Sequence, residues 1–429
     1  MKKIVLFVGL MGMALASIAS VDSASTPRFL TSRWGVGFSG YVNPHLWADT
    51  RQIVGGRDGQ LILWPAKPLL DDNGEDINTN GNLNMLGITS RFGLQFSTPD
   101  VLNANVQGYL EADFSGSTDI ANNIFRLRHA YIQMDWEKSS IMFGQYWHPL
   151  VVHEIMPSVA PLNTGAPFHP YTRQMQIRYA YQVDAFRIFA AAVTQRDNMS
   201  DGPDGQSAVY MRNAILPNLH LQMQYRKGNL FTGIAGDMKA LKPRLSFTAN
   251  DTTLLKAEAK IYSFTATAFA KYDFSHLDIK FQAVWAQNQS DNLMLGGYAE
   301  IFSPRENKYT YTNSNTLSTW LNISKTKGKW CPGIFLGYAK NLGFSDELST
   351  GTHTIFGRGI VPNPIDGESI DYLWRVQPRL VFKANERLEM YTDVEYTSAA
   401  YGVQDLKGII ESSSSIGNTR FMFGVVYLF

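Results

Sequence analysis

The sequence contains a single cysteine, Cys331, in 429 residues, so no disulfide can form within the chain. Beyond its first residues it has no apolar run approaching the roughly 20 residues that a membrane-spanning helix needs. An excess of one charge is also missing, because 38 Lys and Arg face 37 Asp and Glu, which argues against a nucleic-acid-binding protein. No Walker, GxGxxG or GxSxG signature occurs. We therefore expect no enzyme, although a Ser/His hydrolase stays open as an alternative.

The N-terminal residues have the layout of a secretory signal peptide. Lys2 and Lys3 form a basic start, the segment 4–16 is uncharged and apolar, and residues 17–19 form a small-x-small cleavage site. The apolar segment is shorter than a membrane-spanning helix requires. We expect a signal peptide at 1–19, a short N-terminal segment at 20–32, and one folded domain at 33–429.

Alternation of apolar and polar residues dominates the rest of the chain and predicts strands with two different faces. The last ten residues, RFMFGVVYLF, show it, as do residues 86–96 and 219–226. Short turns alternate with long polar segments, which gives about sixteen antiparallel strands, an even number typical of outer-membrane barrels. The long segments are 55–82, 115–123, 148–172, 195–218, 236–256, 287–313, 342–369 and 398–418.

Aromatic residues make up 13% of the chain and flank almost every short turn. A transmembrane barrel places such a ring of aromatics at the membrane interface, whereas a soluble sandwich has no reason to. We therefore predict an all-β, transmembrane antiparallel barrel whose first strand, about 33–47, pairs with the last. The flanking aromatics are Phe96, Trp136, Tyr181, Tyr225, Tyr272, Phe274, Trp330 and Phe382, with Phe429 at the end of the last strand.

Charged residues on the strands are expected to face the lumen, because Arg or Lys facing lipid costs about 2–4 kcal/mol at the midplane. The resulting wall is modestly basic and favours anions. The alternative is that these side chains only solvate the wall and pair with one another. The predicted pore-lining residues are Arg91, Arg126, Arg128, Arg178, Arg187, Arg226, Lys280, Arg375, Arg379, Glu389 and Asp393, with Arg420, Glu111, Asp113, Asp278 and Glu395 also facing inward.

The segment 148–172 differs from the other long connections because it combines five prolines with a mildly apolar middle. A stiff, partly apolar loop of this kind can fold inward and narrow a channel; a surface or subunit-contact loop is the alternative. We expect its polar side chains His148, His153, Glu154 and His169 to line a constriction. Their spacing fits no standard metal-ligand set, and the acidic stretch 71–82 fits no EF-hand, so we expect no metal and no cofactor.

Two adjacent stretches carry a resemblance to a known family. Residues 126–136 read RLRHAYIQMDW and residues 141–150 read IMFGQYWHPL. They resemble the DcaP-like trimeric outer-membrane porins in Arg126, Arg128, Ala130 and Tyr131, followed by Gly144, Gln145 and Trp147. The resemblance implies a homotrimer in the outer membrane of a Gram-negative bacterium, a loop-narrowed pore, and passive uptake of small, often anionic solutes. No heptad pattern fits between residues 19 and 33, so trimerisation would depend on the barrel wall.

We therefore expect an outer-membrane porin with a water-filled channel for passive diffusion of small hydrophilic solutes, leaning toward anions. Its partners would be outer-membrane lipid, those solutes and further copies of the chain, but not nucleic acid. Two alternatives remain. One is a substrate-specific anion or dicarboxylate channel, and the other is a structural or adhesive barrel that acts through its external loops.

Overall fold

The structure is a computed structural model that describes residues 28–31, 34–116, 121–160, 164–249, 253–348, 353–361 and 367–429. The predicted signal peptide, 1–19, and most of the segment 20–32 lie outside these residues. The part of 20–32 that is described, β1 (Arg28–Thr31), pairs with the beginning of the first barrel strand.

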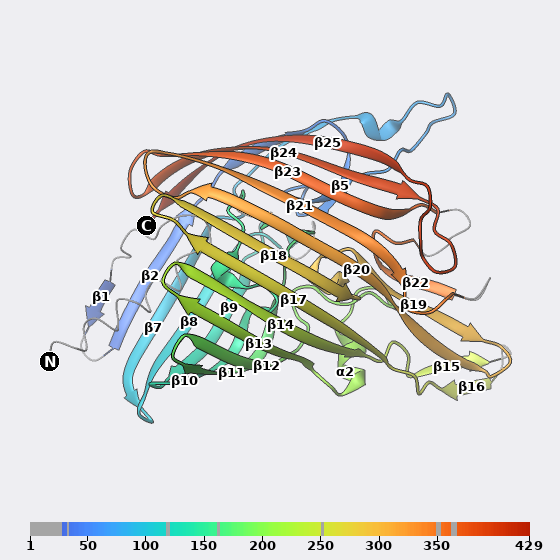
Figure 1. The fold of residues 1–429 in the computed structure, drawn as a ribbon, viewed down its shortest axis with the longest axis horizontal. Coiled ribbons are helices and arrows are strands. Elements are labelled where there is room, and N and C mark those ends of the chain that lie inside the picture. The colour runs from blue at the N-terminus through green and yellow to red at the C-terminus, as the bar shows by residue number, and fades with distance from the viewer. Residues whose placement is uncertain are drawn as a thin grey trace.

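The chain forms a closed antiparallel barrel of 16 strands, as the alternation predicts (Figure 1). Two of the strands are interrupted, one at 43–44 between β2 and β3 and one at 87–90 between β6 and β7. In order around the barrel the strands are β2 (Trp34–Val42) with β3 (His45–Asp49), β6 (Asn82–Leu86) with β7 (Arg91–Val101), β8 (Ala104–Asp113), β9 (Arg126–Asp135), β10 (Ser139–Trp147), β11 (Arg173–Val183), β12 (Phe186–Val193), β13 (Asn218–Lys227), β14 (Leu230–Leu241), β17 (Ile261–Asp273), β18 (Leu277–Gln287), β20 (Lys308–Lys325), β21 (Trp330–Phe344), β23 (Ser369–Lys383), β24 (Leu388–Gly402) and β25 (Ser414–Leu428).

The first and last strands close the barrel, as predicted. β25 pairs with β2 at Tyr41 and with β3 along residues 45–49. The Gly40 N–H donates to the Phe429 carbonyl at 3.1 Å, the Phe429 N–H donates back at 3.0 Å, and the Phe429 ring stacks on Phe38 at 5.5 Å. The junction therefore leaves no free sheet edge on these strands.

The connections alternate in length, with short turns at the end of the barrel where the C-terminus lies and long loops at the other end (Figure 1). Several predicted long segments begin too early or end too late, because β14, β20, β21 and β24 run on beyond the expected boundaries. The loops also carry their own elements: β4 (Ile53–Gly56), β5 (Leu61–Pro65), η2 (Ile77–Thr79), η4 (His153–Ile155), α2 (Val209–Ala214), β15 (Ser246–Ala249), β16 (Thr253–Lys256), η5 (Ser290–Asn292), β19 (Gly296–Ser303) and β22 (His353–Arg358). Among the described residues, no helix is both long and apolar enough to cross a membrane.

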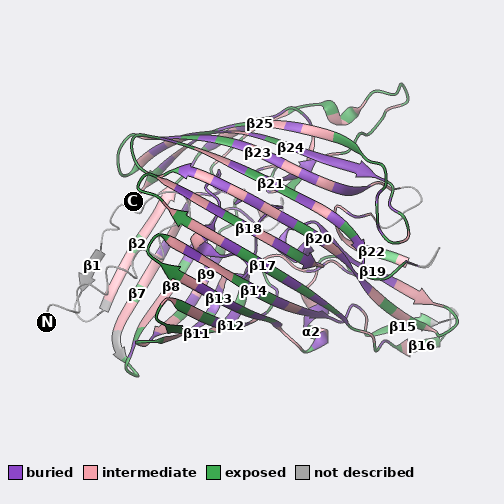
Figure 2. Ribbon diagram, in the orientation of Figure 1, coloured by how far each residue is buried: buried purple, intermediate pink, exposed green. Residues whose placement is uncertain are grey.

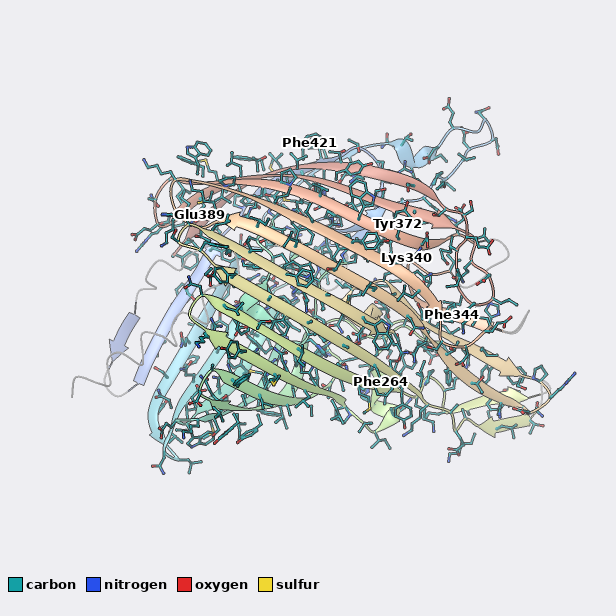
Figure 3. The ribbon with its side chains drawn as sticks, in the orientation of Figure 1. Phe264, Lys340, Phe344, Tyr372, Glu389 and Phe421 are labelled. Atoms are coloured by element: carbon teal, nitrogen blue, oxygen red, sulfur yellow. The ribbon has the colours of Figure 1, made fainter. Side chains whose placement is uncertain are left out.

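The strand faces divide as the alternation predicts (Figure 2). On β13, Leu219, Leu221 and Met223 are exposed on the outer face, while His220 and Gln222 are buried inside. Phe264 and Phe421 likewise project from the outer wall (Figure 3). An outer face this apolar suits lipid. Exposed aromatics of the predicted girdle at the short-turn end are Phe96, Tyr181, Tyr272, Phe274 and Trp330.

Candidate functional site: the barrel lumen

The described parts of the 148–172 loop, 148–160 and 164–172, lie inside the barrel rather than on its surface. The loop leaves β10 and reaches the opposite wall, where the Phe168 ring packs on Phe335 of β21 at 6.2 Å between centroids. The Phe168 ring occupies the space in which a Cβ of Gly337 would lie, so the absence of a side chain there allows the close approach. Backbone groups of the loop are hydrogen-bonded by wall side chains, including the Ser318 hydroxyl to the Phe168 carbonyl at 2.9 Å and the Gln282 amide to the Leu150 carbonyl at 3.2 Å.

The polar side chains expected to line a constriction are mostly buried in this packing. His169 meets Trp320 edge-on at 5.5 Å, and burial lowers its pKa to about 3. His148 lies 3.7 Å from Asp237, and burial lowers its pKa to about 4. Burial also lowers the pKa of His153. These histidines are neutral at pH 7, so they add no positive charge to the lumen. Within the described ranges, no group of three His, Cys, Asp or Glu side chains is arranged to hold a metal ion.

Glu154 is the exception among these four loop residues. It is only partly buried and lies 3.9 Å from Arg226, whose side chain is 58% exposed at the short-turn end of β13. Arg226 also covers the Phe231 ring at 4.5 Å. The two residues therefore border the water-accessible part of the lumen.

A second inward element, the β4–β5 hairpin (53–65), was missed by the sequence analysis, which treated 55–82 as an external polar loop. Leu61, Leu63 and Trp64 are buried in one apolar cluster with residues of the 148–172 loop and of the wall. The run LILW at 61–64 could have indicated this, because four consecutive apolar residues are unusual in an exposed loop. The rest of that connection, including η2, extends away from the barrel (Figure 1).

Most of the predicted pore-lining charges form ion pairs, either across neighbouring strands or, for Lys280 and Asp278, within one strand. Arg128 contacts both Glu111 and Asp113 at 2.6 Å, and Arg126 contacts Asp113 at 3.1 Å. The same network extends to Asp197, which Arg173 contacts at 2.8 Å, and Arg173 was not among the predicted residues. The other ion pairs that involve predicted residues are Arg91–Glu111 at 3.5 Å, Lys280–Asp278 at 3.0 Å, Arg375–Glu395 at 3.1 Å, Arg379–Asp393 at 3.3 Å and Glu389 with Lys383, which was not predicted, at 3.8 Å. Mutual pairing, the alternative noted above, therefore describes much of the wall.

Arg178 on β11 and Arg187 on β12 differ from these arginines. Both are partly exposed, and within the described ranges neither has a carboxylate within 4 Å. Arg178 donates to the Gln176 side chain at 2.9 Å and covers the Tyr146 ring at 5.8 Å, while Arg187 donates weakly to Ser140 at 3.5 Å. Tyr146 in turn packs against Tyr131 at 5.1 Å. The pair thus lies beside an aromatic wall on the short-turn side of the 148–172 loop.

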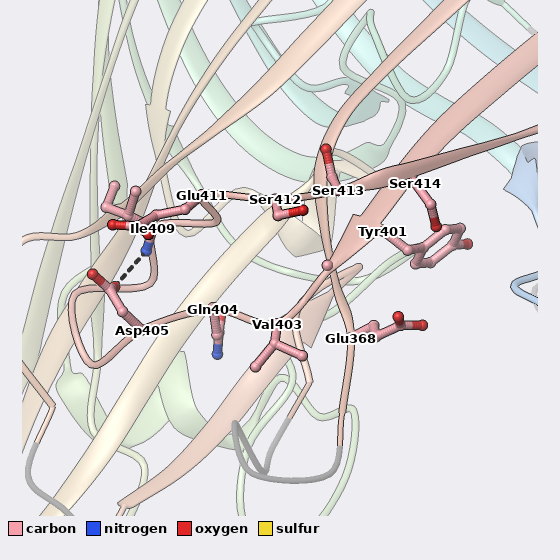
Figure 4. A pocket seen from close by; sticks show the side chains of 11 residues that line it. Glu368, Tyr401, Val403, Gln404, Asp405, Ile409, Glu411, Ser412, Ser413 and Ser414 are labelled. Atoms are coloured by element: carbon pink, nitrogen blue, oxygen red, sulfur yellow. Dashed lines mark hydrogen bonds between the residues drawn. The ribbon is translucent and has the colours of Figure 1, made fainter.

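A separate groove of about 620 Å³ opens at the long-loop rim (Figure 4). Glu368, Tyr401, Gln404 and Glu411 are among the residues that line it. The Tyr401 hydroxyl donates to the Pro65 carbonyl at 2.7 Å, so the groove adjoins the point where the β4–β5 hairpin ends.

Comparison with known proteins agrees with this architecture. The sequence model of the DcaP outer membrane protein family matches residues 67–279, about half of the chain, including the motif that carries the predicted resemblance. The crystal structure of the outer membrane channel DcaP of Acinetobacter baumannii is 16% identical, with a TM-score of 0.66 over 94% of this chain and 99% of that one.

Two further solved structures share the fold. The trimer form of OmpT, an outer membrane protein of Vibrio cholerae, is 12% identical, with a TM-score of 0.53 over 93% of this chain and 100% of that one. An anion-selective porin from Comamonas acidovorans is 11% identical, with a TM-score of 0.53 over 92% of this chain and 100% of that one. Comparison with curated protein sequences gives no match. From the family match and the shared fold, the chain belongs to the DcaP family of proteins in the outer membrane of Gram-negative bacteria.

Proposed function

We propose that the barrel is a porin through which small hydrophilic solutes diffuse, with a preference for anions. The observation that carries the preference is the pair Arg178 and Arg187, whose guanidinium groups no described carboxylate neutralises at ion-pair distance. Asp135 and Glu154 are within electrostatic range, but neither forms an ion pair with them. Charges in a confined aqueous space act strongly on a passing solute, because the low-dielectric wall focuses their field.

The paired arginines contribute less to this preference. The fields of Arg126 and Arg128 are largely cancelled at short range by Glu111 and Asp113. Neutralising Arg126 and Arg128, a reasonable first choice from the sequence, would remove both arginines that contact the buried Asp113 and would leave Glu111 with Arg91 at 3.5 Å, which would threaten folding. Arg178 and Arg187 are therefore the better positions at which to test charge selectivity.

The test is the reversal potential of the purified protein in a planar bilayer under a salt gradient. We expect the wild type to favour anions and the Arg178→Gln/Arg187→Gln variant to approach equal permeability for both ions. A matched control, Arg305→Gln/Lys308→Gln, removes two exposed positive charges at the turn between β19 and β20 and should keep the wild-type value. A wild type without conductance, or an unchanged reversal potential in the double variant, would contradict the proposal.

A substrate-specific anion or dicarboxylate channel is the second candidate, favoured by the aromatic wall beside Arg178. It predicts that conductance is blocked saturably by one dianion, whereas a general porin shows no saturation. We propose a homotrimer as the assembled state, supported by the shared fold with the trimeric OmpT form. Current steps in groups of three, and a trimer mass in detergent, would support it. The proposal involves no catalysis.

A further inference from the structure

Wall arginines bind the β4–β5 hairpin through its backbone. Arg420 of β25 donates to the carbonyls of Gly59 at 2.7 Å and Gln60 at 3.0 Å. Arg375 of β23 donates to the carbonyls of Ile62 at 3.2 Å and Leu63 at 3.4 Å. Two carbonyls just before β5 and two carbonyls within β5 are therefore fixed to two strands of the wall.

Arg375 binds the second inward loop as well. Its guanidinium donates to the Ala166 carbonyl of the 148–172 loop at 2.8 Å. One side chain thus joins both inward elements to the same wall strand. The five donor N–H groups of a guanidinium, arranged in a rigid fork, make this geometry available to arginine and not to lysine.

Both arginines are balanced by wall carboxylates. Arg375 contacts Glu395 at 3.1 Å, and Arg420 contacts Asp49 at 2.7 Å. Each arginine residue is 1% exposed, so neither guanidinium is available to a solute. Although Arg375 was predicted to line the pore, its donors are directed to its carboxylate, to Thr397 and to the two loops.

Apolar packing and a contact at the hairpin tip hold the hairpin over its whole length. Leu61, Leu63 and Trp64 share a buried cluster with Phe168 of the 148–172 loop. At the tip, the Arg57 guanidinium donates to the Ser115 carbonyl at 2.7 Å, just beyond β8. The hairpin therefore extends inside the barrel from β23 to the end of β8.

We propose that the β4–β5 hairpin is a second constriction element and that Arg375 and Arg420 are the positioning residues that keep it inside the lumen. Together with the 148–172 loop it sets the largest solute that passes. The inference deepens the proposed channel function by assigning its size limit to two loops.

The first test replaces hairpin residues 55–63 by a short Gly/Ser linker. A wider path should raise single-channel conductance by at least about twofold and admit larger sugars in liposome swelling assays. The second variant, Arg375→Lys, keeps a positive charge beside Glu395 but cannot reach both loops at once. It should raise conductance and the size limit in the same direction, to a smaller extent.

A matched control is Lys340→Gln, which breaks the ion pair between Lys340 and Asp371 at the long-loop end of β21 (Figure 3). Among the described residues, this ion pair involves neither inward loop. Only variants that keep the heat-modifiable gel mobility of a folded barrel are compared with the wild type. The control should keep wild-type conductance and size limit.

The outcomes separate this inference from the proposed function. If the wild type conducts and both folded variants match it, the hairpin is no constriction and the inference fails while the porin stands. If the wild type shows no conductance and the linker variant conducts, the proposed porin function of the native barrel is refuted, and the hairpin is confirmed as the element that blocks the lumen. If neither conducts, both proposals fail.

Discussion

Acidification is expected to weaken the docking of the 148–172 loop inside the barrel. The contribution of His169 to this effect follows from the burial of its ring. The ring is completely buried against Trp320, and desolvation lowers its pKa from 6.5 to about 3. The docked loop therefore disfavours the imidazolium, whereas an undocked loop exposes the ring to water and takes up a proton at its ordinary pKa.

The sign and the size of the effect follow from this difference. The stabilising contribution of neutral His169 is complete above pH 6.5 and is lost as the pH falls from 6.5 toward 3. At pH 4.5, about two pH units below the ordinary pKa, the loss is about 3 kcal/mol, or about 100-fold in the docking equilibrium. The pKa of His148, which faces Asp237 and His220, is also lowered by burial. Its protonation at low pH therefore adds to the loss of docking in the wild type.

Hydrogen exchange of the loop amides measures docking directly. The His169 N–H donates to the Gly165 carbonyl at 3.0 Å and should lose protection between pH 7 and pH 4.5, after correction for the intrinsic exchange rate. The His169→Phe variant keeps an aromatic ring in place, removes the titration and should lose less protection than the wild type. The control His276→Gln changes an exposed histidine in the turn between β17 and β18 and should behave as the wild type. Equal pH dependence in His169→Phe and the wild type would refute the reasoning.

Further substitutions test individual contacts. Gly144 has φ +141°, and a Cβ there would meet the backbone of β9, so Gly144→Ala should prevent formation of the heat-modifiable barrel. Gly337→Ala inserts a methyl group where the Phe168 ring lies; overpacking should cost about 1–3 kcal/mol, seen as a lower thermal midpoint, and should disturb conductance. Phe429→Ala removes the stack on Phe38 and should lower barrel stability by about 1 kcal/mol, while Phe429→Tyr should restore it in the same unfolding assay.

The architecture was predictable because its signals are local. Period-2 alternation, aromatics beside short turns and long polar connections can each be read within a few residues, and closure of the first strand on the last follows from them. Strand ends at the long-loop side were less predictable. There β14, β20, β21 and β24 extend into the segments that were predicted to be loops.

The contents of the lumen depended on contacts between distant residues. The hairpin 53–65 is held by Arg375 and Arg420, more than 300 residues away, and no local pattern reveals that pairing. Likewise, Arg126 and Arg178 look equivalent in sequence, since both alternate with apolar neighbours. They differ because strand register places Asp113 beside Arg126, whereas no described carboxylate forms an ion pair with Arg178.

The hydrogen bonds by which Arg375 and Arg420 bind the β4–β5 hairpin do not depend on the identity of its side chains. The four hydrogen bonds described above, from these two arginines to Gly59, Gln60, Ile62 and Leu63, end on carbonyl oxygens, a group that all residues share. Natural variation can therefore alter exposed hairpin side chains such as Val54 and Asp58 while the backbone stays docked, whereas Leu61, Leu63 and Trp64 are constrained by the buried cluster. The same property makes the hairpin a suitable place for engineering, where a peptide that recognises a chosen analyte could be inserted to turn the barrel into a nanopore sensor.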